Sequence, residues 1–137
     1  MTPQQKILVQ QSFSKIIPIM DAAAKLFYDK LFELHPPFRA IFKDNMEEQG
    51  RKLMMTLQFA IASLNNLDQL IPALEALGRR HIDYGVQDKD YAIVAAALLW
   101  TLEKGLGPDF TPPVKEAWAS VYEALASTMK RAARDIN

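Results

Sequence analysis

Apolar residues recur every three to four positions along almost the whole chain, which is the spacing of one face of an α-helix. No segment alternates polar and apolar residues in the way a half-buried strand does. The pattern therefore predicts an all-α protein with about seven or eight helices of mixed length joined by short loops, unlike the even repeat of a four-helix bundle.

Prolines and capping residues predict where the helices begin and end. Thr2, Pro3 and Gln5 form a capping-box start for the first helix, and Pro18 should interrupt that helix. Asn45 is a second N-cap candidate. Pro72 is expected to split a leading turn from its helix. The other helices are expected over residues 19–34, 46–64, 67–84, 91–106 (strongly apolar, hence largely buried) and 112–134, with a short helical segment at 38–42.

The helix expected over residues 67–84 carries a histidine in its apolar face. That face consists of Leu67, Leu70, Leu74, Leu77, His81 and Tyr84. Gly85 follows, where an αL helix stop is expected. Because imidazole is polar, His81 must either find a hydrogen-bond partner in the core or give its lone pair to a ligand. A satisfied core histidine is the commoner outcome, so periodicity alone indicates only a helical domain with a pocket.

Two other helices also carry a polar residue on the inward face. Tyr28 lies in the apolar face of the helix over 19–34, and Gln49 lies in the first turn of the helix over 46–64. Each has an ordinary structural explanation: a core tyrosine whose hydroxyl is hydrogen-bonded outward, and a solvated residue at a helix end. With His81 they form the set of candidate functional groups.

Length and charge narrow the class of protein. A chain of 137 residues corresponds to one domain, and its 16 Lys and Arg residues balance its 16 Asp and Glu residues. This balance gives no reason to expect nucleic acid or an anionic membrane as a partner. The sequence shows neither a secretory leader nor a membrane-spanning apolar run, so a cytoplasmic location is expected.

The residue types exclude most catalytic and metal chemistry. The chain has no cysteine, and its two histidines are His35 and His81, so disulfides, cysteine nucleophiles and zinc sites are not expected. Nor does it show an inward carboxylate pair, a glycine-rich phosphate loop or a serine beside a base. A haem remains compatible, because its ring supplies four nitrogens and its iron needs only one protein ligand.

Five segments resemble the single-domain bacterial haemoglobins and the globin domain of flavohaemoglobins. They are LFYDKLFELHPPFRAIF (26–42), EQGRKLM (48–54), LGRRHIDYGV (77–86), DYAIV (90–94) and EAWASVY (116–122). The resemblance covers nearly the whole chain. It implies a globin fold, in which a 3-over-3 helical sandwich surrounds a haem b. It also implies a single domain over residues 1–137, without a reductase or transmitter domain.

The resemblance also assigns roles by position. It implies that His81 is the proximal iron ligand, that Tyr28 and Gln49 form the distal pair facing a bound gas, and that Phe42 stacks on the haem. The other cofactor-binding residues it implies are Leu53 and Leu57 on the distal wall, Leu77, Val86 and Val94 on the proximal side, Lys52 and Arg80 near the propionates, and Tyr91 beside the proximal imidazole.

The function implied by the resemblance is reversible binding of O₂, NO and CO for oxygen storage or delivery. The alternatives are NO dioxygenation with a separate flavin reductase, a haem-based gas sensor, and a haem-free interaction module. A ferric iron that takes the Tyr28 oxygen is a further alternative. Ala133 stands where the family carries a last-helix glutamate paired with the tyrosine at Tyr91, so a peroxidase-like electron push is not expected.

Overall fold

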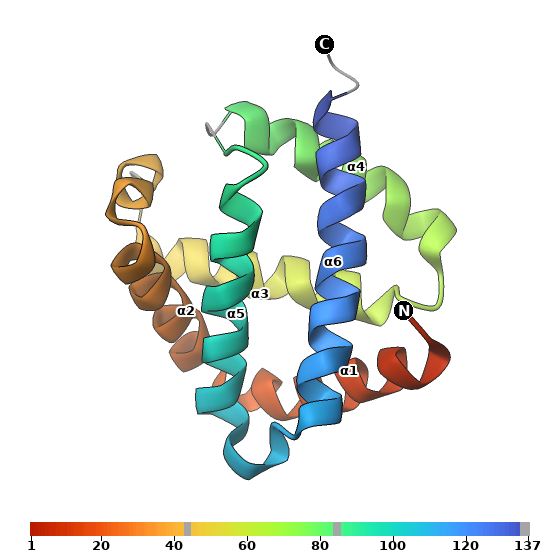
Figure 1. Ribbon diagram of the computed structural model, residues 1–137. Coiled ribbons are helices and arrows are strands. Elements are labelled where there is room, and N and C mark those ends of the chain that lie inside the picture. Colours follow the sequence, from red (N-terminus) through yellow and green to blue (C-terminus); the bar gives the residue numbers. More distant parts are fainter. Residues whose placement is uncertain (43–44, 84–85, 135–137) are drawn as a thin grey trace.

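A computed structural model describes residues 1–42, 45–83 and 86–134, and it is built from helices (Figure 1). Over the described residues it has six α-helices and three short 3₁₀-helices, where the sequence predicts about seven or eight helices, and no strand. The elements are α1 (Pro3–Ile16), η1 (Ile17–Ile19), α2 (Met20–Leu34), η2 (Pro36–Ile41), α3 (Met46–Ala62), α4 (Leu67–Asp83), α5 (Asp90–Leu106), η3 (Gly107–Asp109) and α6 (Pro112–Arg134). The all-α prediction is confirmed.

The helices pack in two crossed layers. Helices α5 and α6 run side by side at the front of the molecule, and α3 crosses behind them (Figure 1). Helix α6 packs mainly on α4 and α1, while α2 packs on both α5 and α3. Helix α3 therefore packs mainly on α2, and α4 packs mainly on α6. This arrangement leaves room for a slot between α3 and α4.

Side-chain caps set the predicted helix starts. The Thr2 hydroxyl accepts a hydrogen bond from the Gln5 amide at 3.1 Å, and the Gln5 side chain accepts one from the Thr2 amide at 2.9 Å. Asn45 Oδ1 accepts a bond from the Glu47 amide at 2.8 Å at the start of α3. These caps satisfy amides that have no partner within the helix.

The two internal prolines act differently. Pro18 lies in η1, and α1 ends at Ile16 as predicted. The prediction that Pro72 splits a leading turn from the next helix is wrong, because α4 is continuous through Pro72. Pro72 lies in the second turn of α4. Its missing N–H therefore deprives only the carbonyl of Asp68, an exposed residue in the first turn where water can take over.

The remaining helix ends follow the sequence closely. The helix stop predicted at Gly85 and the stripe position Tyr84 lie outside the described residues. Beyond them the Val86 amide donates to the His81 carbonyl at 3.0 Å.

Helix α5 is less buried than predicted, because Ala92 and Ala96 are exposed, so only one face of this apolar helix is covered. No helix in the described part of the chain is both long and apolar enough to cross a membrane.

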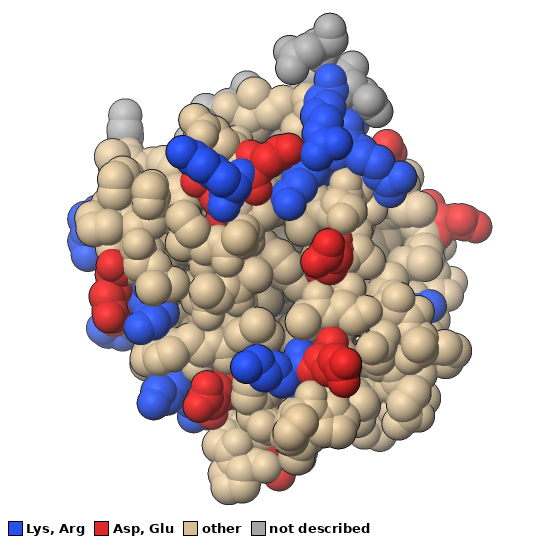
Figure 2. Space-filling model, in the orientation of Figure 1, with Lys and Arg blue, Asp and Glu red and all other residues tan. Residues whose placement is uncertain are grey.

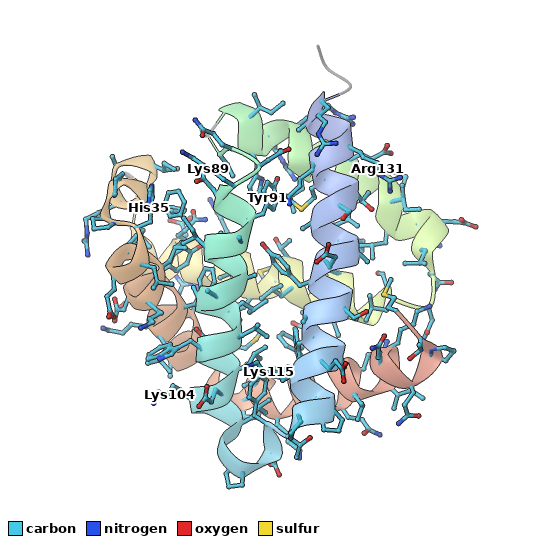
Figure 3. The ribbon with its side chains drawn as sticks, viewed as in Figure 1. His35, Lys89, Tyr91, Lys104, Lys115 and Arg131 are labelled. Atoms are coloured by element: carbon cyan, nitrogen blue, oxygen red, sulfur yellow. The ribbon has the colours of Figure 1, made fainter. Side chains whose placement is uncertain are left out.

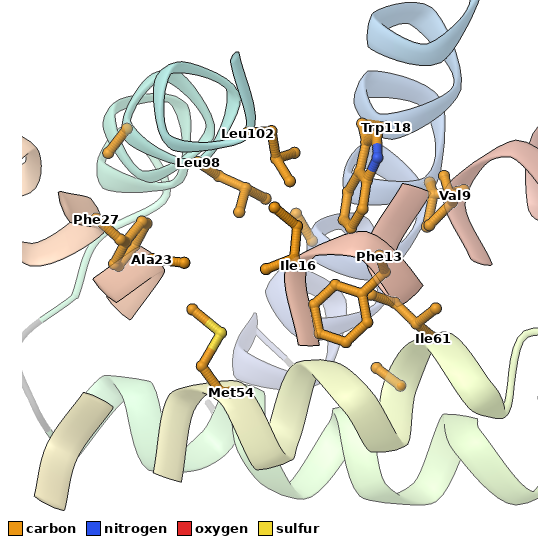
Figure 4. Packing of buried hydrophobic residues seen from close by; sticks show 14 of the residues in the cluster. Val9, Phe13, Ile16, Ala23, Phe27, Met54, Ile61, Leu98, Leu102 and Trp118 are labelled. Atoms are coloured by element: carbon orange, nitrogen blue, oxygen red, sulfur yellow. The ribbon is translucent and has the colours of Figure 1, made fainter. Parts of the chain in front are cut away.

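The core lies where α1 crosses α6 above α3. Figure 4 shows Phe13 between Trp118 of α6 and Ile61 of α3, with Ile16 beside it on the side of α5. One polar pair is buried there: the Trp118 indole N–H donates to Ser12 Oγ at 2.8 Å, and the same hydroxyl donates to the Leu8 carbonyl at 2.7 Å. The pair ties α1 to α6 at the end of α6 opposite α4.

Replacing Ser12 by Ala is expected to lower the free energy of unfolding by about 1–3 kcal/mol, because the buried indole N–H of Trp118 then has no acceptor. Urea unfolding followed by circular dichroism measures this change. Ser14→Ala is the matched control, since Ser14 also bonds within α1, to the Gln11 carbonyl, but is exposed. Equal destabilisation by the two substitutions would contradict this account of the buried pair.

Candidate functional site

His81 is positioned by the carbonyl one turn earlier in α4. Its Nδ1 lies 2.7 Å from the Leu77 carbonyl oxygen, so Nδ1 carries the proton and Nε2 carries the lone pair. Burial lowers the pKa of His81 below its usual value; the Leu77 hydrogen bond opposes this shift and neighbouring Arg80 adds to it. The half-buried ring is therefore neutral at neutral pH, which is the state that ligates iron.

Tyr28, Gln49 and Phe42 come together from three separate segments. Gln49 Nε2 of α3 donates to the Tyr28 hydroxyl of α2 at 3.3 Å. The Tyr28 and Phe42 rings meet edge to face, with centroids 5.2 Å apart. Burial raises the pKa of the Tyr28 phenol, against the opposing effect of the Gln49 hydrogen bond. Tyr28 therefore keeps its proton at neutral pH and can donate it.

A groove of about 270 Å³ lies between α3 and α4. Leu77 and Arg80, two of the predicted cofactor-binding residues, line its α4 side. Its α3 side is formed by residues that the sequence did not single out, and the predicted Leu53 and Leu57 do not line it: Met55, Thr56, Phe59 and Ala60. The Lys52 and Arg80 side chains are both exposed. The other predicted wall residues are half-buried and pack against the core with part of their surface left open: Phe42, Leu53, Leu57, Val86 and Val94.

Tyr91 lies beside the imidazole of His81. The two ring centroids are 6.3 Å apart and the ring planes differ by 26°. The Tyr122 hydroxyl of α6 donates to the Tyr91 backbone carbonyl at 2.7 Å, and Lys130 Nζ lies 5.2 Å from the Tyr91 ring centre. Figure 3 shows Tyr91 near the start of α5, on the side of α6.

His35 lies at the end of α2, apart from Tyr91 (Figure 3). Its ring packs against Phe38 in η2, with centroids 4.3 Å apart. In the described residues, no three His, Cys, Asp or Glu side chains form a group that could hold a metal ion. What the described residues do offer is one neutral imidazole on α4, open aliphatic surface on α3 and α4, and a protonated phenol with an amide on α2 and α3. This donor set fits a haem.

Two glycines help to position these groups, and their roles were not predicted from the sequence. A Cβ on Gly78 would lie 2.3 Å from the Met129 carbonyl oxygen, so α4 crosses α6 with the backbones in contact. A Cβ on Gly50 would lie 2.9 Å from Ala24 Cβ, where α3 crosses α2. An isolated glycine in a helix interior is costly, and that cost is the signal that could have indicated close crossings.

Replacing Gly78 by Ala is expected to push α4 away from α6 and to move His81, three residues further on. We expect a loss of about 1–3 kcal/mol in unfolding free energy and weaker haem retention, because the obstructing atoms are backbone. Gly105→Ala is the control: its Cβ meets chiefly the Cδ1 end of the Ile16 side chain, and Ala gains helix propensity. If the two variants behaved alike in urea unfolding and haem titration, the close crossing would not be what positions His81.

Comparison with known proteins identifies the family. The profile of the Globin family matches residues 25–129. The chain is a globin. Membership brings with it a haem cofactor and haem-based binding of small gases in general.

Proteins similar to this globin include a neuroglobin and two flavohemoproteins. Neuroglobin-1 of Oncorhynchus mykiss is 26% identical over 96% of this chain and 91% of its own length. The flavohemoprotein of Vibrio cholerae serotype O1 is 34% identical over 80% of this chain, and that of Bacillus subtilis is 31% identical over 73%. The chain spans only 30% and 26% of those two flavohemoproteins.

A solved structure confirms the globin fold. The hexacoordinated heme protein from an anhydrobiotic tardigrade superposes with a TM-score of 0.87 over 98% of this chain and 96% of that one. The two sequences are 20% identical, so the likeness concerns the fold.

Proposed function

We propose that this globin holds a haem b between α3 and α4, with His81 Nε2 as axial ligand, and binds O₂ reversibly for storage or delivery. NO and CO are expected to bind at the same place. The observation that carries the proposal is the arrangement of donors. A neutral imidazole lies on α4, and a hydrogen-bonded phenol–amide pair lies on α2 and α3.

The residues proposed to bind the cofactor are mainly apolar residues whose side chains are only partly buried. Leu53 and Leu57 of α3 would cover one face of the haem and Leu77 of α4, with Val86 and Val94, the other. Phe42 would stack on the ring. Lys52 and Arg80 are exposed cations suited to the propionates. When bound, the haem would supply the iron that binds a diatomic gas.

Tyr28 is the hydrogen-bond donor proposed for the bound gas. Gln49 donates to the Tyr28 oxygen, so the phenol proton remains available for another acceptor. Accepting a hydrogen bond also polarises the phenol and strengthens it as a donor. Such a donor favours a ligand that carries partial negative charge, as bound O₂ does, and should slow its release.

The sixth coordination position is proposed to be open in the ferrous protein. A second histidine ligand would have to be His35, whose ring packs on Phe38 at the end of α2. Tyr28, a neutral phenol with its pKa raised by burial, is a poor ligand for ferrous iron. These features favour a penta-coordinate iron, in contrast to the hexacoordinated tardigrade protein.

NO dioxygenation with a separate flavin reductase is the second candidate function, and the flavohemoprotein relatives favour it. In that case the protein should convert NO to nitrate over many turnovers when a flavin reductase and reduced nicotinamide are supplied. Consumption of one equivalent of NO and no more would leave storage or delivery as the function.

Oxygen equilibrium titration of the reduced protein tests the leading proposal. We expect one O₂ per haem, released again when the gas phase is exchanged for argon, with the ferrous spectrum restored. Oxidation to the ferric form on each exposure to O₂ would contradict reversible binding. A protein that shows no Soret band after haem titration would instead be the haem-free interaction module.

A further inference from the structure

Three side chains from three helices connect the surface of α6 to the proposed iron ligand. Lys130 Nζ of α6 lies 5.2 Å from the centre of the Tyr91 ring of α5, and that ring lies 6.3 Å from the ring of His81 on α4. A cation at this distance is attracted to the electron density of the aromatic ring. We call this set the Lys130–Tyr91–His81 column.

Packing fixes the column. Tyr91 is 7% exposed, and its backbone carbonyl accepts the Tyr122 hydroxyl at 2.7 Å. Met129, next to Lys130, meets Gly78 of α4 backbone to backbone, so α4 cannot slide freely along α6 at this level. Burial raises the pKa of the Tyr91 phenol, and nearby Asp88 raises it further, so the ring stays neutral. The ring that Lys130 contacts is therefore fixed beside His81.

The other charged groups near Tyr91 are arranged around this contact. Lys and Arg side chains gather on the α5–α6 face where α6 ends and α5 begins (Figure 2). Asp88 is paired with Arg134 at 3.0 Å. Glu123 lines the same α5–α6 groove as Lys130, about two helical turns earlier in α6. Lys130 is the cation that lies directly over the ring stacked on His81.

We infer that Lys130 is a positioning residue that raises the reduction potential of a haem bound at His81, acting through Tyr91. The inference rests on the proposed function. Ferric haem carries one more positive charge than ferrous haem, so a fixed cation nearby disfavours the ferric form. The buried Tyr91 ring occupies part of the path between the two charges, and that part is not screened by water, while Lys130 itself is half-buried. Lys130 thus favours the ferrous form that binds gas.

Spectroelectrochemistry of haem-loaded variants tests the inference. At a fixed ambient potential, Lys130→Met is expected to lower the ferrous-to-ferric ratio about two- to tenfold. This range corresponds to a unit charge on the order of 12–15 Å from the iron at an effective dielectric constant of about 20–40, because the path from Lys130 to the His81 ring covers 5.2 Å and then 6.3 Å and the iron would lie beyond that ring. Lys130→Gln should shift the ratio in the same direction, and Lys130→Arg should keep the wild-type ratio. The shift should shrink as salt is added.

Lys104→Met is the matched control. Lys104 also lies over an aromatic ring, that of Trp100 at 5.6 Å, and its removal changes the net charge equally, but it is near the far end of α5. Its ferrous-to-ferric ratio should equal that of wild type. Urea unfolding of the apoproteins should show the same small loss of stability, at most about 1 kcal/mol, in Lys130→Met and Lys104→Met, because each removes a cation over an aromatic ring. This comparison separates the electrostatic role from a structural one.

Several outcomes would overturn the inference. They are an unmoved ratio in both neutral Lys130 variants, an equal shift in Lys104→Met, a Lys130→Arg variant that behaves like Lys130→Met, and a shift matched by a larger loss of apoprotein stability than Lys104→Met shows. Failure of the proposed function is a separate result, because then the wild-type protein would not bind haem through His81 at all.

Discussion

Replacing His81 by Gly is expected to weaken haem retention by more than about 100-fold, since removing even an outer-shell partner of a metal ligand commonly costs 10–100-fold. The imidazole is held on α4 by the 2.7 Å contact of Nδ1 with the Leu77 carbonyl, and the glycine variant leaves a space of the same shape. Added imidazole should therefore enter that space and restore both the Soret band and gas binding. Haem transfer to an excess of an apo-myoglobin acceptor measures the loss.

His35→Gly is the control for this substitution. It removes the chain's other histidine, whose ring packs on Phe38 at the end of α2. Haem retention and the spectrum of that variant should equal those of wild type. The account would be contradicted if His81→Gly kept haem and bound gas like wild type without imidazole, or if His35→Gly lost haem instead.

Replacing Tyr28 by Phe is expected to speed O₂ dissociation about 5- to 150-fold, the equivalent of about 1–3 kcal/mol for one polarised hydrogen bond. The association rate should change little, because the ring and its edge-to-face contact with Phe42 remain. Laser photolysis and stopped-flow exchange of O₂ for CO give the two rates separately. CO, which carries less negative charge when bound, should respond less.

Tyr122→Phe is the matched control for the distal hydroxyl. It removes the hydroxyl of a half-buried tyrosine, which donates to the Tyr91 carbonyl on the α5–α6 side of the molecule. It should lower unfolding free energy by about 1 kcal/mol and leave the O₂ off-rate unchanged. Gln49→Leu should raise the off-rate as well, and the double variant with Tyr28→Phe should show less than the sum, because the two residues share one hydrogen bond. An off-rate in Tyr28→Phe equal to that of wild type would rule out the donor role.

The features that could be predicted from the sequence are those carried by a few neighbouring residues. The capping box at Thr2, the N-cap at Asn45 and the break at Pro18 each depend on a short stretch of backbone, and all three are in the structure. The prediction that Pro72 splits a turn from its helix is wrong because it, too, considers only a short stretch of backbone. A local proline rule does not take into account that the one carbonyl it leaves unpaired lies in an exposed first turn of α4.

Periodicity cannot predict contacts between segments that are far apart in the sequence. Spacing placed Tyr28 and Gln49 on inward faces, but nothing in it shows that residues 21 positions apart share a hydrogen bond. Only the resemblance to globins paired them. Gly78 and Lys130 are the clearest omissions, because a glycine at a helix crossing and a lysine over a ring acquire their roles from the packing of α4, α5 and α6.

The absorption spectrum of the haem-loaded protein, reduced with dithionite and then exposed to CO, tests the central claim most directly. The account predicts a penta-coordinate, high-spin ferrous spectrum before CO, and complete conversion to a six-coordinate carbonyl spectrum by one CO per haem. A ferrous spectrum that is already six-coordinate before CO is added would contradict it, since a second side chain would then occupy the position proposed for the gas.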